Sequence, residues 1–253
     1  MSMNSLGLVV AAMGYYGGYG YGPGFGMFYD PTYILVLIGV VISLIASAKV
    51  NSAFAKYNRV RSYSGLTGAQ TAERILRSNG IMDVSIRCIP GKLTDHYDPS
   101  KKVVSLSESV YNGTSIAAIA VAAHECGHCL QHDTDYAPLN IRTALVPVAN
   151  IGSSLSWVFI ILGILFGGSS LLINIGIILF SAAVAFQVVT LPVEFNASRR
   201  ALGCIESMGI LRADELKGGR KVLRAAALTY VAATLTAILQ LLRLIFLFGK
   251  RDD

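Results

Sequence analysis

The chain has 253 residues, a formal net charge of +6 at pH 7 and a mean hydropathy of +0.56. Apolar residues make up 53% of it and charged residues only 14%, which excludes an ordinary soluble enzyme and favours an integral membrane protein. Four cysteines are too few for a secreted disulfide scaffold, and no nucleic-acid-binding motif accompanies the positive charge.

The first 30 residues contain a tract rich in glycine and tyrosine, from Met13 to Phe28. Such a composition cannot build a packed core. We therefore expect residues 1–30 to form a flexible segment whose tyrosines can touch the membrane interface, and we assign them no catalytic role.

Four later segments are apolar enough to cross a bilayer, which takes about 20 residues per helix. They predict a first transmembrane helix at 31–48, a transmembrane hairpin of two helices at 146–193 and a fourth transmembrane helix at 225–249, followed by a short tail at 250–253. The first helix has no basic residue before it and no cleavage site after it, so it should remain as an anchor. The sequence thus predicts a mainly α-helical membrane protein with about four transmembrane helices.

Residues 49–145, between the first two spans, are typical of a small cytosolic α+β unit of zincin type. A helix should begin at Thr67, and alternating apolar residues predict strands at 84–89 and 103–107, with a hairpin-like turn at 97–102 before the second strand. His96 lies in the polar stretch between the strands, where a solvated loop histidine is expected.

The second strand is our candidate for peptide binding. In zincins an edge strand above the metal pairs with an extended substrate. By that analogy the substrate would bind along Val103, Val104, Ser105 and Leu106. Packing of the apolar side chains in a core explains these residues equally well.

The most specific motif is HExxH at His124–His128, late in an apolar run from Ser115 to His132 that should be helical. Two histidines four residues apart lie on one helix face, so both imidazoles can reach one metal ion. Glu125 lies close by, where it can take a proton from metal-bound water. The pattern predicts one zinc ion per chain and a hydrolytic reaction.

A catalytic zinc needs a third protein ligand and an open position for water. His132 lies eight residues beyond His124, roughly 12 Å along the helix, and cannot complete the same tetrahedron. Glu194 is the best carboxylate, because it follows the transmembrane hairpin and returns to the same interface as the motif. The alternative is an interfacial glutamate paired with Arg199 or Arg200.

Cys126 and Cys129 form a CxxC pair within the motif helix, and Cys88 and Cys204 are isolated. No second CxxC with zinc-finger spacing is present. Small buried thiols in a reducing compartment account for all four cysteines better than redox catalysis does.

All but three of the 21 Lys and Arg residues lie in two segments, 49–145 and 194–224. The positive-inside rule therefore places both segments in the cytoplasm and the N-terminus outside. This leaves Lys250 and Arg251 on the outer face, and it attributes the net positive charge to topology and contact with anionic lipid.

The residues around the motif resemble the bacterial YugP-type neutral zinc metallopeptidases. The resemblance extends over nearly the whole chain from about residue 28. It rests on His124–His128, Gln131, Tyr136–Leu139, Arg142 and Leu191–Ala201, together with Tyr29–Tyr33 and Gly65–Ala69. A more distant resemblance connects HExxH and Glu194-Phe-Asn-Ala to the HtpX and CAAX prenyl protease group of gluzincins.

The resemblance implies Glu194 as a zinc ligand and Glu125 as the residue that polarises the water. That group usually has Asp four residues after the ligand glutamate, whereas this chain has Ser198. Asn196 or Ser198 can still hydrogen-bond a histidine ring and fix its tautomer. Tyr136 and Arg142 are further candidates near the site, although packing explains both about as well.

These observations predict an integral membrane zinc metallopeptidase, active on the cytoplasmic side of a bacterial plasma membrane. Its expected partners are a peptide or membrane-protein substrate and the bilayer, with no nucleic acid. Two rivals remain: a non-catalytic scaffold with a structural zinc, and a prenyl-peptide-type protease of narrow specificity.

Overall fold

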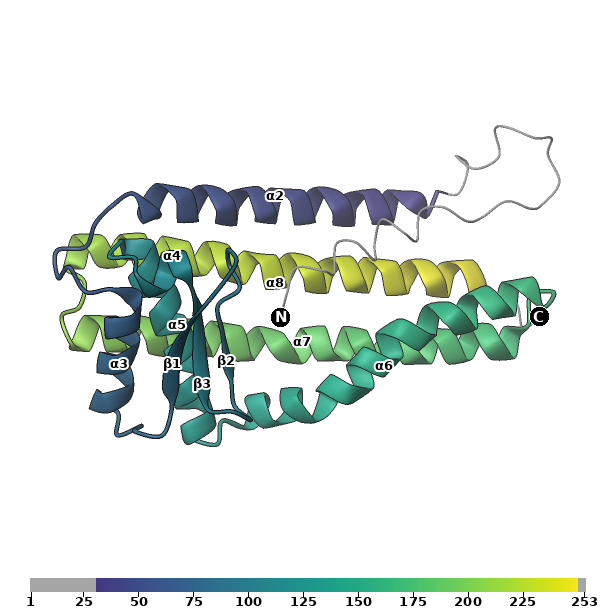
Figure 1. Ribbon diagram of the computed structural model, residues 1–253. Helices are drawn as coiled ribbons and strands as arrows, with labels where there is room; N and C mark the ends of the chain where they lie inside the picture. Colours follow the sequence, from purple (N-terminus) through teal and green to yellow (C-terminus); the bar gives the residue numbers. More distant parts are fainter. Residues whose placement is uncertain (1–30, 250–253) are drawn as a thin grey trace.

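A computed structural model describes residues 31–249 of the chain. The predicted flexible segment at 1–30 and the tail at 250–253 lie outside the described residues. The described part is mainly helical, with a three-stranded sheet and shorter helices gathered at one end of four long helices (Figure 1).

The four long helices are long and apolar enough to cross a membrane, as predicted. They are α2 (Tyr33–Asn58), α6 (Ala137–Leu165), α7 (Ser170–Ser207) and α8 (Ala213–Phe248). Helix α8 packs against α2 and α7, and α6 packs against α7 (Figure 1). The chain is therefore a helical membrane protein.

Each long helix extends past one boundary of its predicted span: α2 and α7 end later than predicted, and α6 and α8 begin earlier. The boundaries at 48/49, 145/146, 193/194 and 224/225 all fall inside helices, including the one beside Pro192 in α7. Membrane-spanning and polar segments are therefore parts of the same rigid helices, and a side chain on α7 can be positioned by packing on either side of that boundary.

The smaller unit contains α3 (Gly68–Ser78), α4 (Glu108–Tyr111) and α5 (Ile116–Asp133). The side chain of Thr67 caps α3 by accepting a hydrogen bond from the Gln70 amide, which explains why the helix begins where the sequence predicts. Strands β1 (Ser85–Ile89), β2 (His96–Asp98) and β3 (Val103–Ser107) form the sheet in the order β1-β3-β2.

The sheet corrects two predictions. Strand β3 is central, parallel to β1 and antiparallel to β2, so the prediction that Val103–Leu106 form a free edge is wrong. Val104, Ser105 and Leu106 are fully buried, which leaves core packing as the role that the structure supports. His96 belongs to β2 rather than to a loop, because a third strand pairs where only a turn was expected.

Helix α5 runs through the core of this unit. Its apolar face packs on α3 and the sheet, and its opposite side meets α7 and α8. Buried residues from widely separated parts of the chain contribute to one cluster, among them Ile75, Leu106, Ile119 and Ile205. The smaller unit is therefore continuous with the ends of the long helices.

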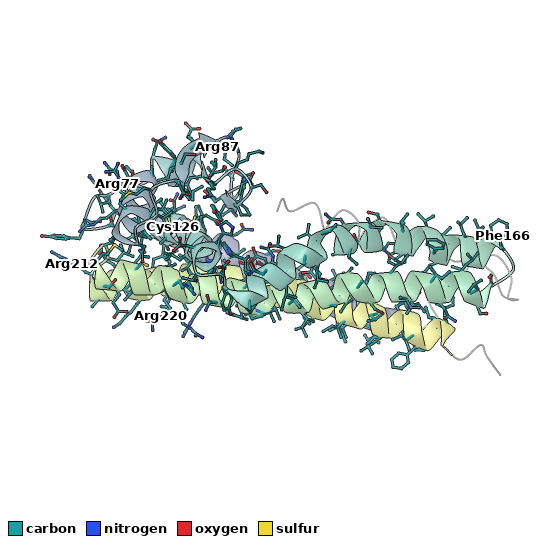
Figure 2. All side chains as sticks on the ribbon, turned by 90° about the horizontal axis from the view of Figure 1, so that it is seen from below. Arg77, Arg87, Cys126, Phe166, Arg212 and Arg220 are labelled. Atoms are coloured by element: carbon teal, nitrogen blue, oxygen red, sulfur yellow. The ribbon has the colours of Figure 1, made fainter. Side chains whose placement is uncertain are left out.

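Both basic segments meet at the same end of the molecule. Arg77 and Arg87 of the smaller unit lie at that end together with Arg212 and Arg220, whereas Phe166 in the α6–α7 turn lies at the opposite end (Figure 2). A single face of the membrane can therefore hold both basic segments, as the charge pattern requires.

Candidate metal centre

Helix α5 presents the two motif histidines on one face. Ser115 begins the helix by accepting a hydrogen bond from the Ala118 amide at 3.1 Å. Two and a half turns later the rings of His124 and His128 lie edge to face, with their centroids 4.9 Å apart. Because the two histidines are four residues apart on a helix, their imidazoles are directed to the same point.

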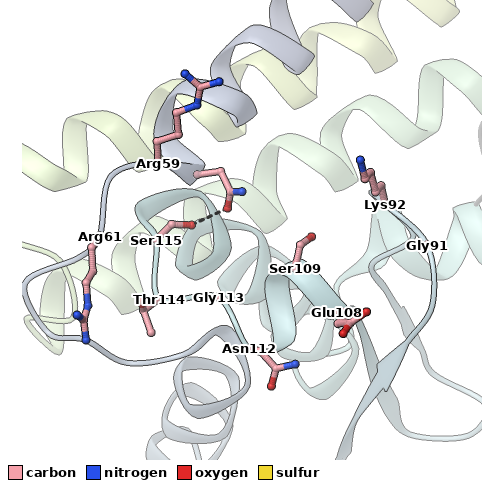
Figure 3. A pocket seen from close by; sticks show the side chains of 11 residues that line it. Arg59, Arg61, Gly91, Lys92, Glu108, Ser109, Asn112, Gly113, Thr114 and Ser115 are labelled. Carbon is pink, nitrogen blue, oxygen red and sulfur yellow. Dashed lines mark hydrogen bonds between the residues drawn. The ribbon is translucent and has the colours of Figure 1, made fainter.

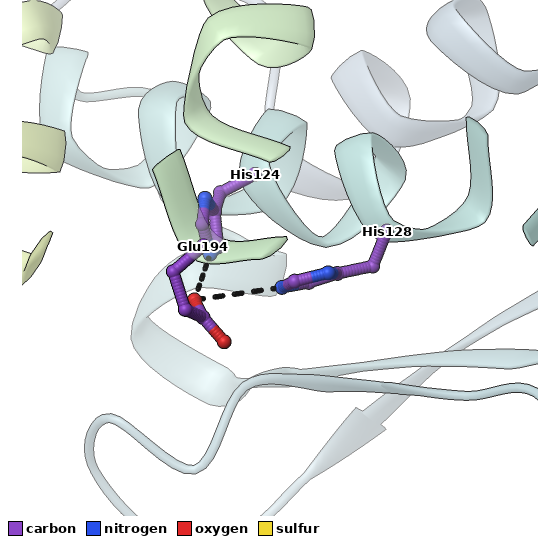
Figure 4. A group of neighbouring side chains, drawn as sticks. All are labelled: His124, His128 and Glu194. Carbon is purple, nitrogen blue, oxygen red and sulfur yellow. Dashed lines mark hydrogen bonds and ion pairs between the residues drawn. The ribbon is translucent and has the colours of Figure 1, made fainter. Parts of the chain in front are cut away.

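Glu194 of α7 completes this group (Figure 4). Its Oε2 atom lies 3.3 Å from Nε2 of His124 and 3.7 Å from Nε2 of His128. The potential ligand atoms of the three residues all lie within 4.8 Å of one another. Zinc bonds of about 2.0–2.2 Å at tetrahedral angles separate ligand atoms by roughly 3.3–3.6 Å, so the three side chains fit such an ion.

A very close approach of α5 to α7 makes this meeting possible. A Cβ atom on Gly127 would lie 2.4 Å from the backbone oxygen of Ala197, so only glycine fits between the two histidines. Since Ala197 lies one turn after Glu194, the same contact that requires Gly127 holds the carboxylate over the histidines.

Ser198 lies beside the outer nitrogen of one histidine. Its Oγ is 3.2 Å from Nδ1 of His124. A hydroxyl can accept the Nδ1 proton and leave the Nε2 lone pair free.

Gln131 does the same for the second histidine. Nε of Arg200, which can only donate, gives its hydrogen to Oδ1 of Asn196 at 2.9 Å. The same oxygen accepts from the Gln131 amide nitrogen, which also donates to the Val193 carbonyl. The Gln131 carbonyl must therefore face His128, and Nδ1 of His128 must carry the proton at 3.0 Å.

These hydrogen bonds fix the tautomer of His128, and that tautomer makes a bound cation favourable. With its proton on Nδ1, neutral His128 directs an Nε2 lone pair at the Glu194 carboxylate, itself an acceptor and only 3% exposed. Two buried acceptors that face each other repel unless a proton or a metal ion lies between them. The donor set of two imidazoles and one carboxylate is one that zinc takes in proteins.

Glu125 is buried beside the group, on the same helix. Burial raises the pKa of its carboxyl to about 7, the charge of Glu194 acts in the same direction, and His124 opposes both. The Glu125 carboxyl thus responds to the charges of His124 and Glu194, two of the three converging side chains.

The other candidates lie in different surroundings. His132 is directed away and has its Nδ1 3.1 Å from the Tyr97 hydroxyl. Arg200 lies over the Tyr136 ring, 5.8 Å from its centroid, and donates to Leu130, so it does not serve as the ion-pair partner of Glu194. Tyr136 therefore packs on Arg200, one of the hydrogen-bonded residues that orient His128.

The thiols of the CxxC pair are not directed at the histidines. Cys126 donates to the Ala72 carbonyl and Cys129 to the Glu125 carbonyl, and burial raises the pKa of both. Cys204 is half-buried, but Cys88 on β1 is exposed, which corrects the prediction that all four cysteines are buried.

A surface hollow lies at the other end of α5. Arg59, Arg61, Lys92 and Glu108 line it around the helix N-terminus at Ser115 (Figure 3). The motif histidines lie two and a half turns further along the helix, so this hollow and the metal centre are separate features.

Comparisons with known proteins agree with this geometry. Residues 32–249 match the family described as "putative neutral zinc metallopeptidase". The chain belongs to this family. It is also 51% identical to a Bacillus subtilis protein named "putative membrane protease YugP", over 220 residues that cover 87% of this chain and 97% of the relative. No solved structure gives a significant match.

Membership of the family confirms the resemblance found in the sequence and implies zinc as the metal. Sequence reasoning missed Gln131 as a partner of the His128 ring, although this residue was among those that carried the resemblance. The sequence spacing could have predicted this contact, because an amide three residues after a helical histidine lies on the same helix face.

The first prediction concerns the helix contact at Gly127. Gly127→Ala should force α7 away from α5, displace Glu194 and weaken zinc binding by about tenfold or more. Gly203→Ala on α7 is the control, because a Cβ atom there meets nothing within 4 Å. Equal zinc affinity of both variants, measured by competition with a chelating dye, would contradict the role of this contact.

The second prediction concerns the tautomer of His128. Gln131→Leu removes the carbonyl that accepts the Nδ1 proton and should lower zinc affinity roughly 10- to 100-fold. Thr134→Val is a matched control at the end of α5, since the Thr134 hydroxyl bonds only to carbonyls of its own helix. An unchanged dissociation constant for Gln131→Leu would show that the hydrogen bond does not orient the ring.

Proposed function

We propose that this protein is an integral membrane zinc metallopeptidase of the gluzincin type. His124, His128 and Glu194 would hold one zinc ion, and Glu125 would act as the general base. The observation that supports this most strongly is the convergence of two imidazole Nε2 atoms on a buried carboxylate oxygen 3.3 and 3.7 Å away.

The number of protein donors supports a catalytic site rather than a structural one. Among residues 31–249 the group has three members, and structural zinc sites are usually closed by four protein ligands. Three ligands leave a position for water, which a scaffold with a structural zinc does not need.

When bound, zinc would lower the pKa of water and polarise the scissile carbonyl. The Glu125 carboxylate takes one proton from the attacking water as the new C–O bond forms. It then passes that proton to the amide nitrogen as the C–N bond breaks, so the products are an amine and a carboxylic acid, which loses its remaining proton to water. Ser198 and Gln131 keep both Nε2 atoms free throughout by accepting the Nδ1 protons.

The third prediction tests hydrolysis. Glu125→Gln should retain one zinc per chain and reduce the cleavage of a peptide and membrane-protein panel by roughly 10²–10⁴-fold, because the amide cannot take the proton. Glu194→Ala should lose zinc, and His132→Ala should keep both zinc and activity. The peptidase assignment fails if zinc-loaded wild-type protein cleaves nothing in the panel.

We also propose that the metal centre lies on the cytoplasmic side and the N-terminus outside. The support is electrostatic: both basic segments lie at the end of the bundle that carries the smaller unit (Figure 2). The peptide substrate would then reach the centre from the cytoplasm or along the inner surface of the membrane.

The fourth prediction tests this sidedness with the exposed thiol of Cys88. In a Cys204→Ser background, a membrane-impermeant maleimide should label the protein in inverted membrane vesicles and not in intact cells. A Cys88→Ser variant in the same background should lose the label. Labelling in intact cells alone would reverse the topology.

A further inference from the structure

Contacts between α7 and α8 give the depth of the metal centre along the row of long helices. The Thr234 hydroxyl of α8 donates to the Gln187 carbonyl of α7 at 3.3 Å, so these two residues lie at one level. The helices are antiparallel neighbours (Figure 1). Glu194 comes seven residues after Gln187, and Ala227 comes seven residues before Thr234. Glu194 therefore lies level with Ala227.

Charged residues mark the two ends of the apolar part of α8. The stretch from Arg224 to Arg243 contains no other charged residue and is about 28 Å long at 1.5 Å per residue. This length matches the hydrocarbon core of a bilayer, which is about 30 Å thick. Ala227 lies about 4.5 Å inside the stretch. The metal centre therefore lies at the boundary between the hydrocarbon core and the headgroups, on the membrane side of Arg224.

Helix α2 gives the same level independently. The Thr236 hydroxyl of α8 donates to the Gly39 carbonyl of α2 at 3.1 Å, and these two helices are also antiparallel neighbours (Figure 1). Lys49 comes ten residues after Gly39 and is the first charged residue of α2, so the apolar span of α2 ends level with Ala226. Arg142, half-buried on α6, likewise directly precedes the apolar span of that helix.

The exposed surface changes its character at this level. Lys49, Arg199 and Arg224 are exposed and can reach the phosphates of the headgroups. Beside the centre, in contrast, Phe195 and Leu228 are 46% and 42% exposed. Large apolar side chains with this exposure are favourable in lipid and unfavourable in water. The outer surface next to Glu194 therefore suits acyl chains rather than the cytoplasm.

Helix α5 brings the histidines to the same depth. A Cβ atom on Gly219 of α8 would lie 3.6 Å from the side chain of Ala120, so these two residues are neighbours. His128 comes eight residues after Ala120, and Ala227 comes eight residues after Gly219. Helix α5 therefore runs along α8 toward the membrane, and its motif arrives where α7 places Glu194.

We propose that the substrates of this centre are membrane-anchored polypeptides, cut in the segment that leaves a transmembrane helix on the side of the smaller unit. The proposal rests on the zinc peptidase function above and narrows its substrate class. The backbone of such a segment already lies at the depth of His128 and Glu194. A soluble polypeptide would have to enter the headgroup layer and lose hydration of its backbone, which costs free energy.

The distance between the cut bond and the anchor separates this substrate class from others. Any anchored polypeptide shares one bilayer with the enzyme, which raises its effective concentration. A bond far from the anchor gains the same confinement but does not lie at the depth of the centre. Depth therefore predicts that cleavage falls with distance from the span, whereas confinement alone does not.

The first test measures depth without any turnover. Full-length protein that carries Cys88→Ser and Cys204→Ser is reconstituted in vesicles of phosphatidylcholine and phosphatidylglycerol. A nitroxide label is attached to Lys221→Cys, Leu228→Cys or Leu235→Cys, which are exposed positions at heptad spacing on one face of α8.

The background protein is the control for this labelling. It should take up no label, because its remaining thiols, Cys126 and Cys129, are buried. The Leu228 label should lose most of its collisions with a water-soluble nickel chelate and collide mainly with oxygen, as the Leu235 label does. The Lys221 label, about 10 Å further out, should meet the chelate freely. Equal access of the chelate to the Leu228 and Lys221 labels would overturn the proposal.

The second test varies the distance of the bond from the anchor. One single-span reporter carries a randomised segment directly after its transmembrane helix. A second reporter carries the same segment beyond a semi-rigid helical spacer of about 20 residues, roughly 30 Å long. Zinc-loaded protein in the same vesicles should cut the first reporter about tenfold faster or more, because only its bonds are held at the centre. Glu125→Gln should cut neither.

The two proposals fail in different ways. Equal cleavage of both reporters would overturn the substrate class and leave the peptidase function intact. If neither reporter is cut while the Leu228 label lies in the lipid phase, the peptidase function fails and the depth of the centre stands.

Discussion

The close contact between α5 and α7 at Gly127 is the constraint on which the rest of the structure depends. The Ala197 carbonyl occupies the space that any side chain at position 127 would fill. Because α7 is one unbroken helix from Ser170 to Ser207, fixing it at Ala197 also fixes Glu194 one turn earlier. Two residues far apart in the sequence thus place a carboxylate against two imidazoles with little freedom to move.

Hydrogen bonds to the outer nitrogens of the histidines determine what the metal centre can bind. Arg200 can only donate, so the amide oxygen of Asn196 must face it. That oxygen also accepts from the Gln131 amide nitrogen, so the Gln131 carbonyl faces His128 and the proton of His128 lies on Nδ1. The consequence is a lone pair directed at a buried carboxylate, an arrangement that is unfavourable until a cation arrives. The groups that orient both histidine rings belong to the protein itself, which reduces the cost of assembling the site.

Local patterns predicted much of this correctly, and long-range packing explains where they failed. HExxH on a helix, the four apolar spans and the α3 cap at Thr67 follow from spacing and composition alone. The sheet order does not, because β2 is only three residues long and β3 became central when it paired on both sides. The donation from Arg200 to the Leu130 carbonyl had no signal in the sequence either, since it arises only when α7 packs beside α5.

The central claim is that two imidazoles and one carboxylate bind zinc and leave a position open. X-ray absorption spectroscopy of the zinc-loaded protein tests this most directly. The account predicts a first shell of nitrogen and oxygen at about 2.0–2.2 Å, with two imidazoles and no sulfur. A zinc–sulfur distance of about 2.3 Å, which would require Cys126 or Cys129 as a ligand, would contradict it.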